Sequence, residues 1–390
     1  MMYQLINFAV PNVIFGMDTI DVVGQEAAKL GAKRALLISG PNVQKSGAVD
    51  RAVDSLKKAG IEAVLRIDER SLGEPTTQNA EDAAAFAKDS KAECIIGLGG
   101  GSVIDVAKMA AALVVNPGGV SEYLGVEKVP RRGLPTIMMP TTAGTSAEVT
   151  KIAVFLDEQT KAKKVVASSA LLPDKAIIDP KLTYSCPPTV TANTGIDAFI
   201  HAAESYLSAN TNPITDNIAL GAIEMISKWI GKAYAKPDHS DARYYMSMGS
   251  LMAGMVMGNS GTSLIHALSY PIGGEYHINH GRALTPILRA CLEHIVVAVE
   301  DKLVLMAKAM GEKVDYLPSR ESAALCLDAL EQMCARLGLP ICLEDAGISD
   351  KSRVDKWAEG AYAERRLLSR CMCELSLEDC KKIYLAAFRG

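Results

Sequence analysis

Short apolar runs alternate with helical patterns over the first 185 residues, and this alternation is the feature that most constrains the fold. The runs are bounded by Gly, Pro, Ser or charged residues, as buried parallel strands usually are. They are Ala35–Ile38, Ala63–Leu65, Cys94–Leu98, Thr136–Met139 and Ala176–Ile178. Helical patterns such as 49–59 and 79–88 lie between several of these runs. Strand and helix in turn predict right-handed βαβ units in an α/β layer with a parallel sheet.

The pattern changes after Cys186-Pro187-Pro188, because the rest of the chain is rich in Ala, Leu, Met and Glu at helical spacing. No stretch there has the pattern of a convincing strand. We therefore predict an α/β domain over residues 1–185 and an all-helical domain over residues 186–390. The length agrees with this division, since 390 residues at roughly 100–200 per domain favour two domains.

The charge balance and the hydropathy exclude two classes of partner. Lys and Arg total 41 and Asp and Glu total 45, so the net charge of −4 offers no basic excess to a nucleic acid. No stretch approaches the roughly 18 uninterrupted apolar residues that a membrane span needs. The first basic residue is Lys29, so we expect no secretory signal. The sequence therefore predicts a soluble cytoplasmic protein.

The nine cysteines agree with a reducing compartment. Their number is odd, their spacings are irregular, and a chain of 390 residues can bury a core without disulfides. We expect reduced thiols that mostly pack as small apolar side chains. One residue separates Cys371 from Cys373, whereas redox and zinc motifs have two residues between their cysteines.

A glycine-rich turn, Gly99-Gly100-Gly101-Ser102, joins the run 94–98 to a predicted helix over 103–114. Bare backbone N–H groups and the positive helix N-terminus suit a pyrophosphate. Ser102 could cap the helix or bind phosphate, and Asp105 could favour the helix dipole or brace the turn. The pattern is not G-x-G-x-x-G, and a tight turn would explain the glycines equally well, so both interpretations stay open.

A second polar segment, 140–148, follows the run 136–139 at the carboxyl edge where α/β sheets bind ligands. Its hydroxyls and its glycine suit contacts to phosphate or ribose. A helix start would also account for it, with Thr145 or Ser146 as the N-cap and Glu148 completing a capping box.

Asp197 and His201 are four residues apart, on one face of a helix that we expect to open at Asn193 or Thr194. A carboxylate and an imidazole so placed can reach one divalent ion. The spacing alone is weak evidence, because a capping aspartate beside an ordinary core histidine would look the same.

A histidine cluster strengthens the case for a metal. Three of the six histidines, His266, His277 and His280, fall within 15 residues around the predicted helix breaker 271–274. We expect Pro271 to end the helix of His266, and His280 to open the next helix. The four side chains that would share one ion, as an N₃O set suited to Fe²⁺ or Zn²⁺ with an open position, are Asp197, His201, His266 and His280.

Four segments together resemble the iron-dependent (group III) alcohol dehydrogenase family over essentially the full length. They are Gly99–Asp105, Pro140–Thr150, Asn193–Glu204 and His266–Gly281. The resemblance implies a dehydroquinate synthase-like architecture, with NAD(H) or NADP(H) in the cleft between two domains and Fe²⁺, or alternatively Zn²⁺, on the four ligands above. The cofactor positions that it implies are Gly40, Gly99, Gly100, Gly101, Ser102, Asp105, Thr141, Thr142, Thr145 and Lys163.

The chain departs from the family pattern at three places. Many relatives carry an acidic residue at the position of Gly40, where a carboxylate would bind the ribose and repel a 2′-phosphate, so NADP(H) is not excluded. Tyr270 stands where many relatives have a second active-site histidine. The stretch 370–373 (Arg-Cys-Met-Cys) replaces the usual Asn-Pro-Arg.

The resemblance implies reversible hydride transfer between NAD(P)(H) and a small primary alcohol or aldehyde. Candidates for the proton relay are Tyr270, His277 and the ribose of the cofactor. The substrate positions that it implies, or that adjoin its motifs, are Lys151, Met257, Asn259 and Arg282. A cation among them could hold an anionic aldehyde such as succinic semialdehyde, sulfoacetaldehyde or phosphonoacetaldehyde. Packing, or a solvent-facing salt bridge, is the alternative role for these residues.

Two other functions stay open at this point. The architecture also serves cyclising lyases similar to dehydroquinate synthase, although those need several cationic side chains to hold a polyanionic sugar acid. A non-catalytic structural homologue would not need four intact metal ligands. The resemblance further implies a homodimer or a larger homo-oligomer.

Overall fold

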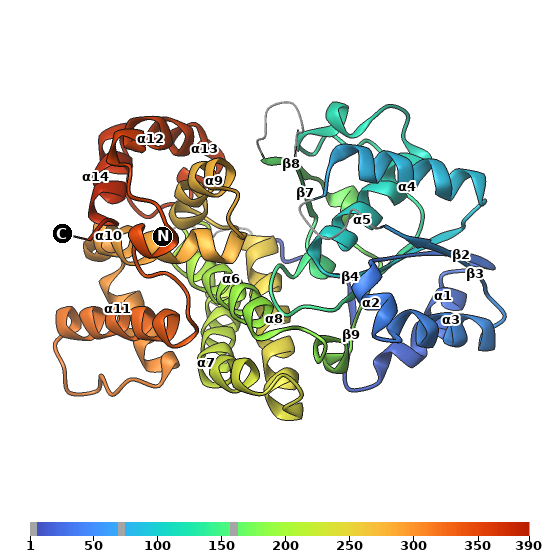
Figure 1. The fold of residues 1–390 in the computed structure, drawn as a ribbon, viewed down its shortest axis with the longest axis horizontal. Coiled ribbons are helices and arrows are strands. Elements are labelled where there is room, and N and C mark those ends of the chain that lie inside the picture. The colour runs from blue at the N-terminus through green and yellow to red at the C-terminus, as the bar shows by residue number, and fades with distance from the viewer. Residues whose placement is uncertain (1–5, 69–74, 157–162, 390) are drawn as a thin grey trace. The chain divides into compact units, whose positions relative to one another are not determined.

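The computed structural model describes residues 6–68, 75–156 and 163–389, which fold into two compact units (Figure 1). One unit spans Ala9–Cys186, and the other consists of residues 187–389 together with residues 6–8. The predicted fold class is confirmed, since the first unit contains a parallel sheet and the second is helical. No helix in the described ranges is both long enough and apolar enough to cross a bilayer.

The main sheet has six strands, all parallel, in the order β1-β9-β6-β4-β2-β3. The strands are β1 (Asn12–Phe15), β2 (Arg34–Ser39), β3 (Glu62–Ile67), β4 (Cys94–Gly99), β6 (Thr136–Pro140) and β9 (Lys175–Ile178). Five of them confirm the predicted runs. Strand β1 was not predicted, because one of its four residues is exposed, three are partly buried, and they carry little of the apolar signal of a central strand.

Alternate residues of the central strands face two separate cores. Leu36 and Ile38 of β2 pack into the core beneath α4 and α5, whereas Ala35 and Leu37 face the core of α1 and α3. The helices of this unit are α1 (Val23–Lys29), α2 (Pro41–Lys45), α3 (Ala48–Lys58), α4 (Thr77–Asp89) and α5 (Gly101–Val115). Helices on both faces explain why the strands are apolar along their whole length.

A second, three-stranded sheet was not predicted. It has the order β5-β8-β7 and consists of β5 (Gly125–Val126), β7 (Ile152–Leu156) and β8 (Lys163–Ala167). Strands β7 and β8 pair antiparallel, with Ile152 opposite Ala167. Because β8 begins with two lysines and β5 has only two residues, neither segment carries the continuous apolar pattern used to find strands.

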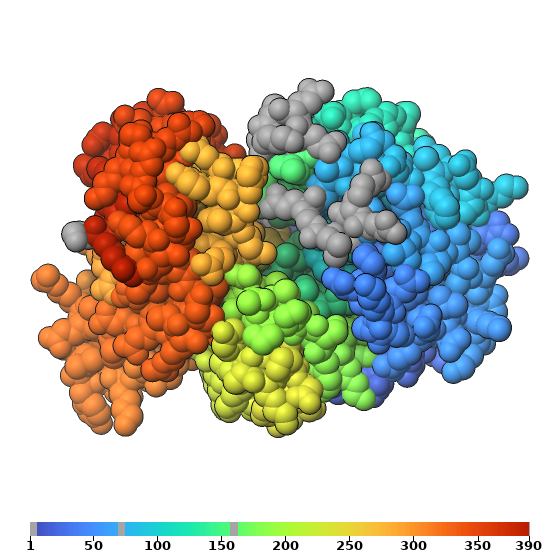
Figure 2. Space-filling model, in the orientation of Figure 1, coloured from blue at the N-terminus to red at the C-terminus, as the bar shows by residue number. Residues whose placement is uncertain are grey.

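The second unit is helical throughout its described residues 187–389, as predicted. Its helices are α6 (Pro188–Tyr206), α7 (Pro213–Ala235), α8 (Ser240–Ser260), α9 (Leu264–Tyr276), α10 (His280–Met310), α11 (Ser319–Arg336), α12 (Val354–Ala363), α13 (Arg365–Leu368) and α14 (Leu377–Ala386). Helices α12, α13 and α14 gather on one side of this unit, where they form the orange-red to deep-red surface of Figure 2.

Two predicted helix boundaries are wrong. Helix α6 begins at Pro188, before the expected start at Asn193 or Thr194, because proline at the first helical position loses no hydrogen bond. Helix α9 passes through Pro271 and ends only at Tyr276. The ring of Pro271 lies against Gly360 of α12, so packing holds the helix together where a lone proline would interrupt it. The expected opening of a helix at His280 is confirmed.

Candidate functional site

The predicted metal ligands come together around one carboxylate oxygen. Asp197 and His201 lie on α6, His266 lies on α9, and His280 is the first residue of α10. Asp197 Oδ1 is 3.4 Å from His201 Nε2, 3.8 Å from His266 Nε2 and 3.7 Å from His280 Nε2. The His201 and His266 rings stack with their centroids 5.0 Å apart. Three helices therefore aim three imidazole nitrogens at the same carboxylate.

The electrostatics of this cluster favour a cation. Burial raises the pKa of the Asp197 carboxyl, but the neighbouring imidazoles outweigh burial and bring it below its ordinary value. Asp197 Oδ1 and His266 Nε2 are buried, and neither makes a hydrogen bond within the described part of the chain. Orphaned polar atoms of this kind are costly unless something binds them. A divalent ion among the four side chains would satisfy both atoms, so the residues fit the metal.

Glu204, for which no role was predicted, holds one of these imidazoles. Its Oε2 accepts a hydrogen bond from His266 Nδ1, and its Oε1 accepts one from the backbone N–H of Ile265 at 2.6 Å. Burial lowers the pKa of His266, but the carboxylates of Glu204 and Asp197 raise it to about 9. Glu204 lies three residues after His201 on α6, and this spacing on one helix face was the available signal.

The two candidates for the proton relay lie at different depths. Tyr270 is half-buried one turn after His266, with its ring centroid 6.1 Å from that of His280. Burial raises the pKa of its phenol above the ordinary value, so Tyr270 stays protonated at neutral pH. His277 is exposed at the C-terminus of α9 in a left-handed conformation, with φ of 52°.

The glycine-rich turn is built for close backbone approach. Helix α5 begins at Gly101 with Gly100 as its N-cap, so the expectation that Ser102 caps the helix is wrong. A Cβ atom on Gly99 would lie 2.7 Å from the Val103 side chain, and one on Gly101 would lie 2.6 Å from Thr145 Oγ1. Both glycines therefore pack where no side chain fits, which leaves the N-terminus of α5 bare.

The segment after β6 lies against this turn. Thr141 donates a backbone hydrogen bond to the Gly99 carbonyl at 2.9 Å, and Thr142 is the nearest side chain to Gly100. The capped helix considered for this segment is not formed. Ser146 takes a left-handed conformation, its hydroxyl donates to the Gly144 carbonyl, and only a short 3₁₀ turn, Ala147–Val149, follows. The two polar segments follow β4 and β6 at the carboxyl edge of the sheet, and β4 adjoins β2, where the strand order reverses and α/β sheets bind ligands.

A buried ionic cluster joins α5 to the segment after β6 and to β7. The Asp105 carboxylate forms an ion pair with Lys108 Nζ at 3.1 Å and accepts a hydrogen bond from the Val154 N–H at 3.0 Å. Lys108, whose side chain is fully buried, also donates to the carbonyls of Ala147 and Ile152. Asp105 thus joins α5 to β7, and its bracing of the turn and its cofactor contact both stay predictions. Lys108 was not among the predicted site residues; its signal was a single cation in a largely apolar helix.

The remaining cofactor positions lie on the same unit. Gly40 follows β2 and is the N-cap of α2, and Lys163 is the first residue of β8. A carboxylate that was not singled out, Asp68, follows the neighbouring strand β3. It is buried, accepts a hydrogen bond from Asn79 at 3.2 Å, and lines a small pocket together with Ser102.

The four substrate positions differ in their surroundings. Lys151 is 3.6 Å from Glu127 Oε1 in an exposed ion pair. This contact is the solvent-facing salt bridge that was the alternative to a substrate role. Arg282 lies on α10 and donates to the Gly338 carbonyl at 3.5 Å. Met257 is buried on α8, and Asn259 on the same helix donates to the Met255 carbonyl. A substrate role for these residues stays a prediction.

Two family models together match nearly the whole chain. Residues 11–180 match the iron-containing alcohol dehydrogenase model, and residues 191–388 match the C-terminal model of the Fe-containing alcohol dehydrogenase family.

Named relatives and solved structures agree with these models. The long-chain-alcohol dehydrogenase 1 of Geobacillus thermodenitrificans is 39% identical over 96% of this chain and 94% of the relative. The sulfoacetaldehyde reductase of Bilophila wadsworthia is 32% identical over 93% and 94%. A crystal structure of 1,3-propanediol oxidoreductase superposes with a TM-score of 0.94 at 31% identity, covering 99% of this chain and 100% of its own. The chain is therefore an enzyme of the iron-containing alcohol dehydrogenase family.

Proposed function

We propose that this enzyme transfers a hydride reversibly between a nicotinamide cofactor and a small primary alcohol or aldehyde. The observation that supports this most is the position of Asp197 Oδ1, 3.4–3.8 Å from three imidazole nitrogens. Asp197, His201, His266 and His280 would hold Fe²⁺, with Zn²⁺ as the alternative. When bound, the divalent ion supplies Lewis acidity toward the oxygen of the substrate.

The protein groups then have separate tasks. Glu204 fixes the His266 ring so that its Nε2, and not its Nδ1, is available as a ligand. Tyr270 keeps its proton at neutral pH and can donate a hydrogen bond beside the ligand set. His277, being exposed, is the candidate that exchanges protons with solvent.

We propose NAD(H) as the preferred cofactor. The turn 99–102, with Thr141, Thr142, Thr145 and Lys163, would hold the dinucleotide at the carboxyl edge of the sheet. Gly40 offers no carboxylate, but Asp68 brings an acidic side chain to the end of the adjacent strand, where it would disfavour a 2′-phosphate. A structural neighbour, the sulfoacetaldehyde reductase from Bifidobacterium kashiwanohense, was solved in complex with NAD⁺; it is 25% identical, with a TM-score of 0.88.

A cationic side chain in the substrate pocket would narrow the substrate class to aldehydes with a terminal anion. Lys151 already has a carboxylate partner, so recognition of an aldehyde with a terminal anion would depend on Arg282. The relatives named above act on both kinds of substrate, since one is a long-chain-alcohol dehydrogenase and one a sulfoacetaldehyde reductase. The cytoplasmic location and the homo-oligomeric state stay predictions.

The test is a steady-state assay of the iron-loaded protein. NADH and NADPH are compared with a panel of short aldehydes that do or do not carry a terminal carboxylate or sulfonate. We expect NADH oxidation with at least one aldehyde, loss of that activity in His266→Ala, and lower kcat/KM with NADPH. Equal kcat/KM for matched neutral and anionic aldehydes would exclude the anionic class. Absence of turnover with every aldehyde would contradict the proposed reaction and reopen the cyclising lyase or a non-catalytic role.

A further inference from the structure

Cys371 and Cys373 differ from the other cysteines of the chain. Seven of the nine cysteines are buried, whereas these two are half-exposed. They lie in the turn between α13 and α14. Their sulfur atoms are 3.7 Å apart. Two accessible thiols therefore face each other at a position that the proposed reaction does not use.

Hydrogen bonds on both sides hold this turn. The Cys371 N–H donates to the Leu368 carbonyl at 3.0 Å, and the Arg370 carbonyl accepts from the Ala209 N–H at 2.8 Å. After the pair, Ser376 caps α14 through a reciprocal capping box with Asp379. The two thiols thus lie between anchored ends, and little conformational entropy would be lost if a ligand joined them.

The sulfur separation suits a shared cation better than a disulfide. Two sulfurs bound to one tetrahedral Zn²⁺ at about 2.3 Å lie about 3.8 Å apart. A disulfide would require the same atoms to approach to about 2.05 Å. Burial raises the pKa of the Cys371 thiol to about 12, which slows oxidation because the thiolate is the reactive form. A metal ion overcomes this by displacing the protons itself.

We propose that Cys371 and Cys373 form a two-thiolate site for a soft divalent cation, with ligands separate from the N₃O set. Binding forms two metal–sulfur bonds, breaks two S–H bonds and releases two protons to solvent. The product of one dication and two thiolates is electrically neutral, which suits a half-buried position next to Arg370. Solvent completes the coordination.

Cadmium tests this proposal directly, because sulfur ligands give Cd²⁺ an ultraviolet charge-transfer band that nitrogen and oxygen ligands do not. The full chain, iron-loaded and reduced with a phosphine, is titrated with Cd²⁺ alone. We expect the band to saturate at one Cd²⁺ per chain and to weaken as the pH falls. Cys371→Ser and Cys373→Ser should each lose the band, while the matched control Cys342→Ser keeps it.

Iron content and NADH oxidation, measured on the same samples, show that the serine variants are folded and that the N₃O set is intact. Absence of the band in the wild-type protein would overturn the proposal. Retention of the band in either Cys371→Ser or Cys373→Ser would also overturn it, because the ligands would then be other thiols.

Discussion

At the scale of single residues, the Glu204 carboxylate controls how His266 is presented. It holds Nδ1 and leaves Nε2 facing Asp197. We expect Glu204→Gln to weaken iron binding by roughly 10–100-fold, because the substituted amide no longer fixes the tautomer and the orientation of the ring. Iron titration followed by activity measures this effect, and excess iron should restore most of the kcat. The exposed Glu224 on α7 provides the control, since Glu224→Gln should leave iron affinity unchanged.

Glu148 gives the α/β unit a pH-dependent stability. Burial raises the pKa of this carboxyl from 4.5 to about 7. Between pH 4.5 and pH 7 the folded protein keeps a proton on Glu148 that the unfolded chain has lost. The contribution of Glu148 to the free energy of unfolding is therefore complete below pH 4.5 and is lost as the pH rises through 7. Urea unfolding at pH 5 and pH 8 measures it. In Glu148→Gln the loss of stability between these pH values should be smaller, by about 3 kcal/mol. An equal loss in wild type and variant would contradict the assignment.

Residue types alone could predict part of the site. His266 and His280 stood out because histidine is rare in this chain and they lie close together in the sequence. Glu204 and Lys108 did not, because glutamate and lysine are common and usually exposed. Only the burial of Lys108 against backbone carbonyls reveals its bracing role, and burial depends on the tertiary fold.

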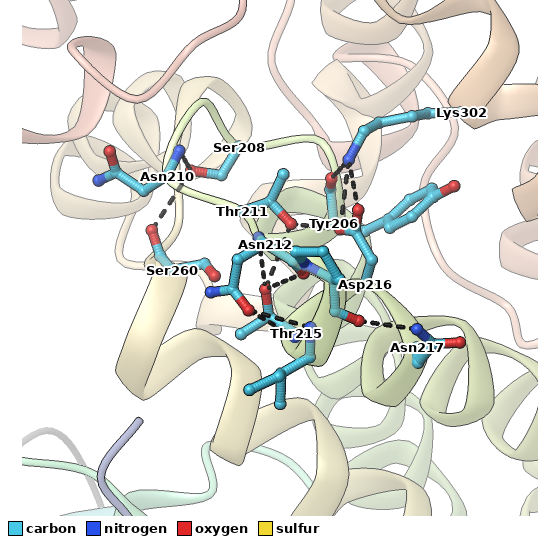
Figure 3. A network of polar contacts seen from close by, with 12 residues as sticks. Tyr206, Ser208, Asn210, Thr211, Asn212, Thr215, Asp216, Asn217, Ser260 and Lys302 are labelled. Carbon is cyan, nitrogen blue, oxygen red and sulfur yellow. Dashed lines mark hydrogen bonds and ion pairs between the residues drawn. The ribbon is translucent and has the colours of Figure 1, made fainter. Parts of the chain in front are cut away.

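At the scale of elements, polar contacts order the connection between α6 and α7, and Asn212 in this connection caps the start of α7 (Figure 3). Asn212 Oδ1 accepts from the backbone N–H groups of Ile214 and Thr215, and Thr215 Oγ1 accepts from the Asn212 N–H. Loss of this cap in Asn212→Ala should cost about 1 kcal/mol of unfolding free energy. Urea unfolding measures the change, with exposed Asn210→Ala as the control. Equal stability of the two variants would show that the cap contributes little.

The glycine-rich turn allows a matched comparison of two neighbouring substitutions. Gly101→Ala places a methyl group 2.6 Å from Thr145 Oγ1, whereas the nearest atom to the same group in Gly100→Ala is 3.8 Å away. We expect Gly101→Ala to lose about 2 kcal/mol through overpacking and Gly100→Ala to lose little. Both should raise the KM for NADH if the turn holds the pyrophosphate. An unchanged KM in both variants would contradict that assignment.

Element prediction succeeded where a single pattern dominated. The central strands are apolar along their length, which is sufficient to find them. The predicted end of α9 at Pro271 was too early, because a proline is a helix-ending signal only in its local sequence. The residue that packs against the Pro271 ring, Gly360, lies almost 90 positions later in the chain. The antiparallel pair β7 and β8 was missed for a related reason, because pairing, and not composition, stabilises short strands with polar residues.

At the scale of the whole molecule, the metal ion and the dinucleotide are assigned to different units of the chain. All four candidate metal ligands lie within residues 187–389, and every candidate cofactor contact lies within residues 9–186. A ligand stabilises the unit that binds it by mass action, by about 2.7 kcal/mol at 100 times its Kd. Iron and NADH should therefore protect different parts of the chain.

Hydrogen exchange followed by mass spectrometry resolves the two effects. Iron should slow exchange in α6, α9 and the start of α10, whereas NADH should slow it in β4 and the first turns of α5. In Asp197→Asn we expect the protection by iron to disappear and NADH to bind with a Kd within about threefold of wild type, because the substitution removes a metal ligand and leaves the α/β unit intact. Loss of NADH binding in Asp197→Asn would mean that the dinucleotide depends on the metal ligands, and the assignment of the cofactor to residues 9–186 would be wrong.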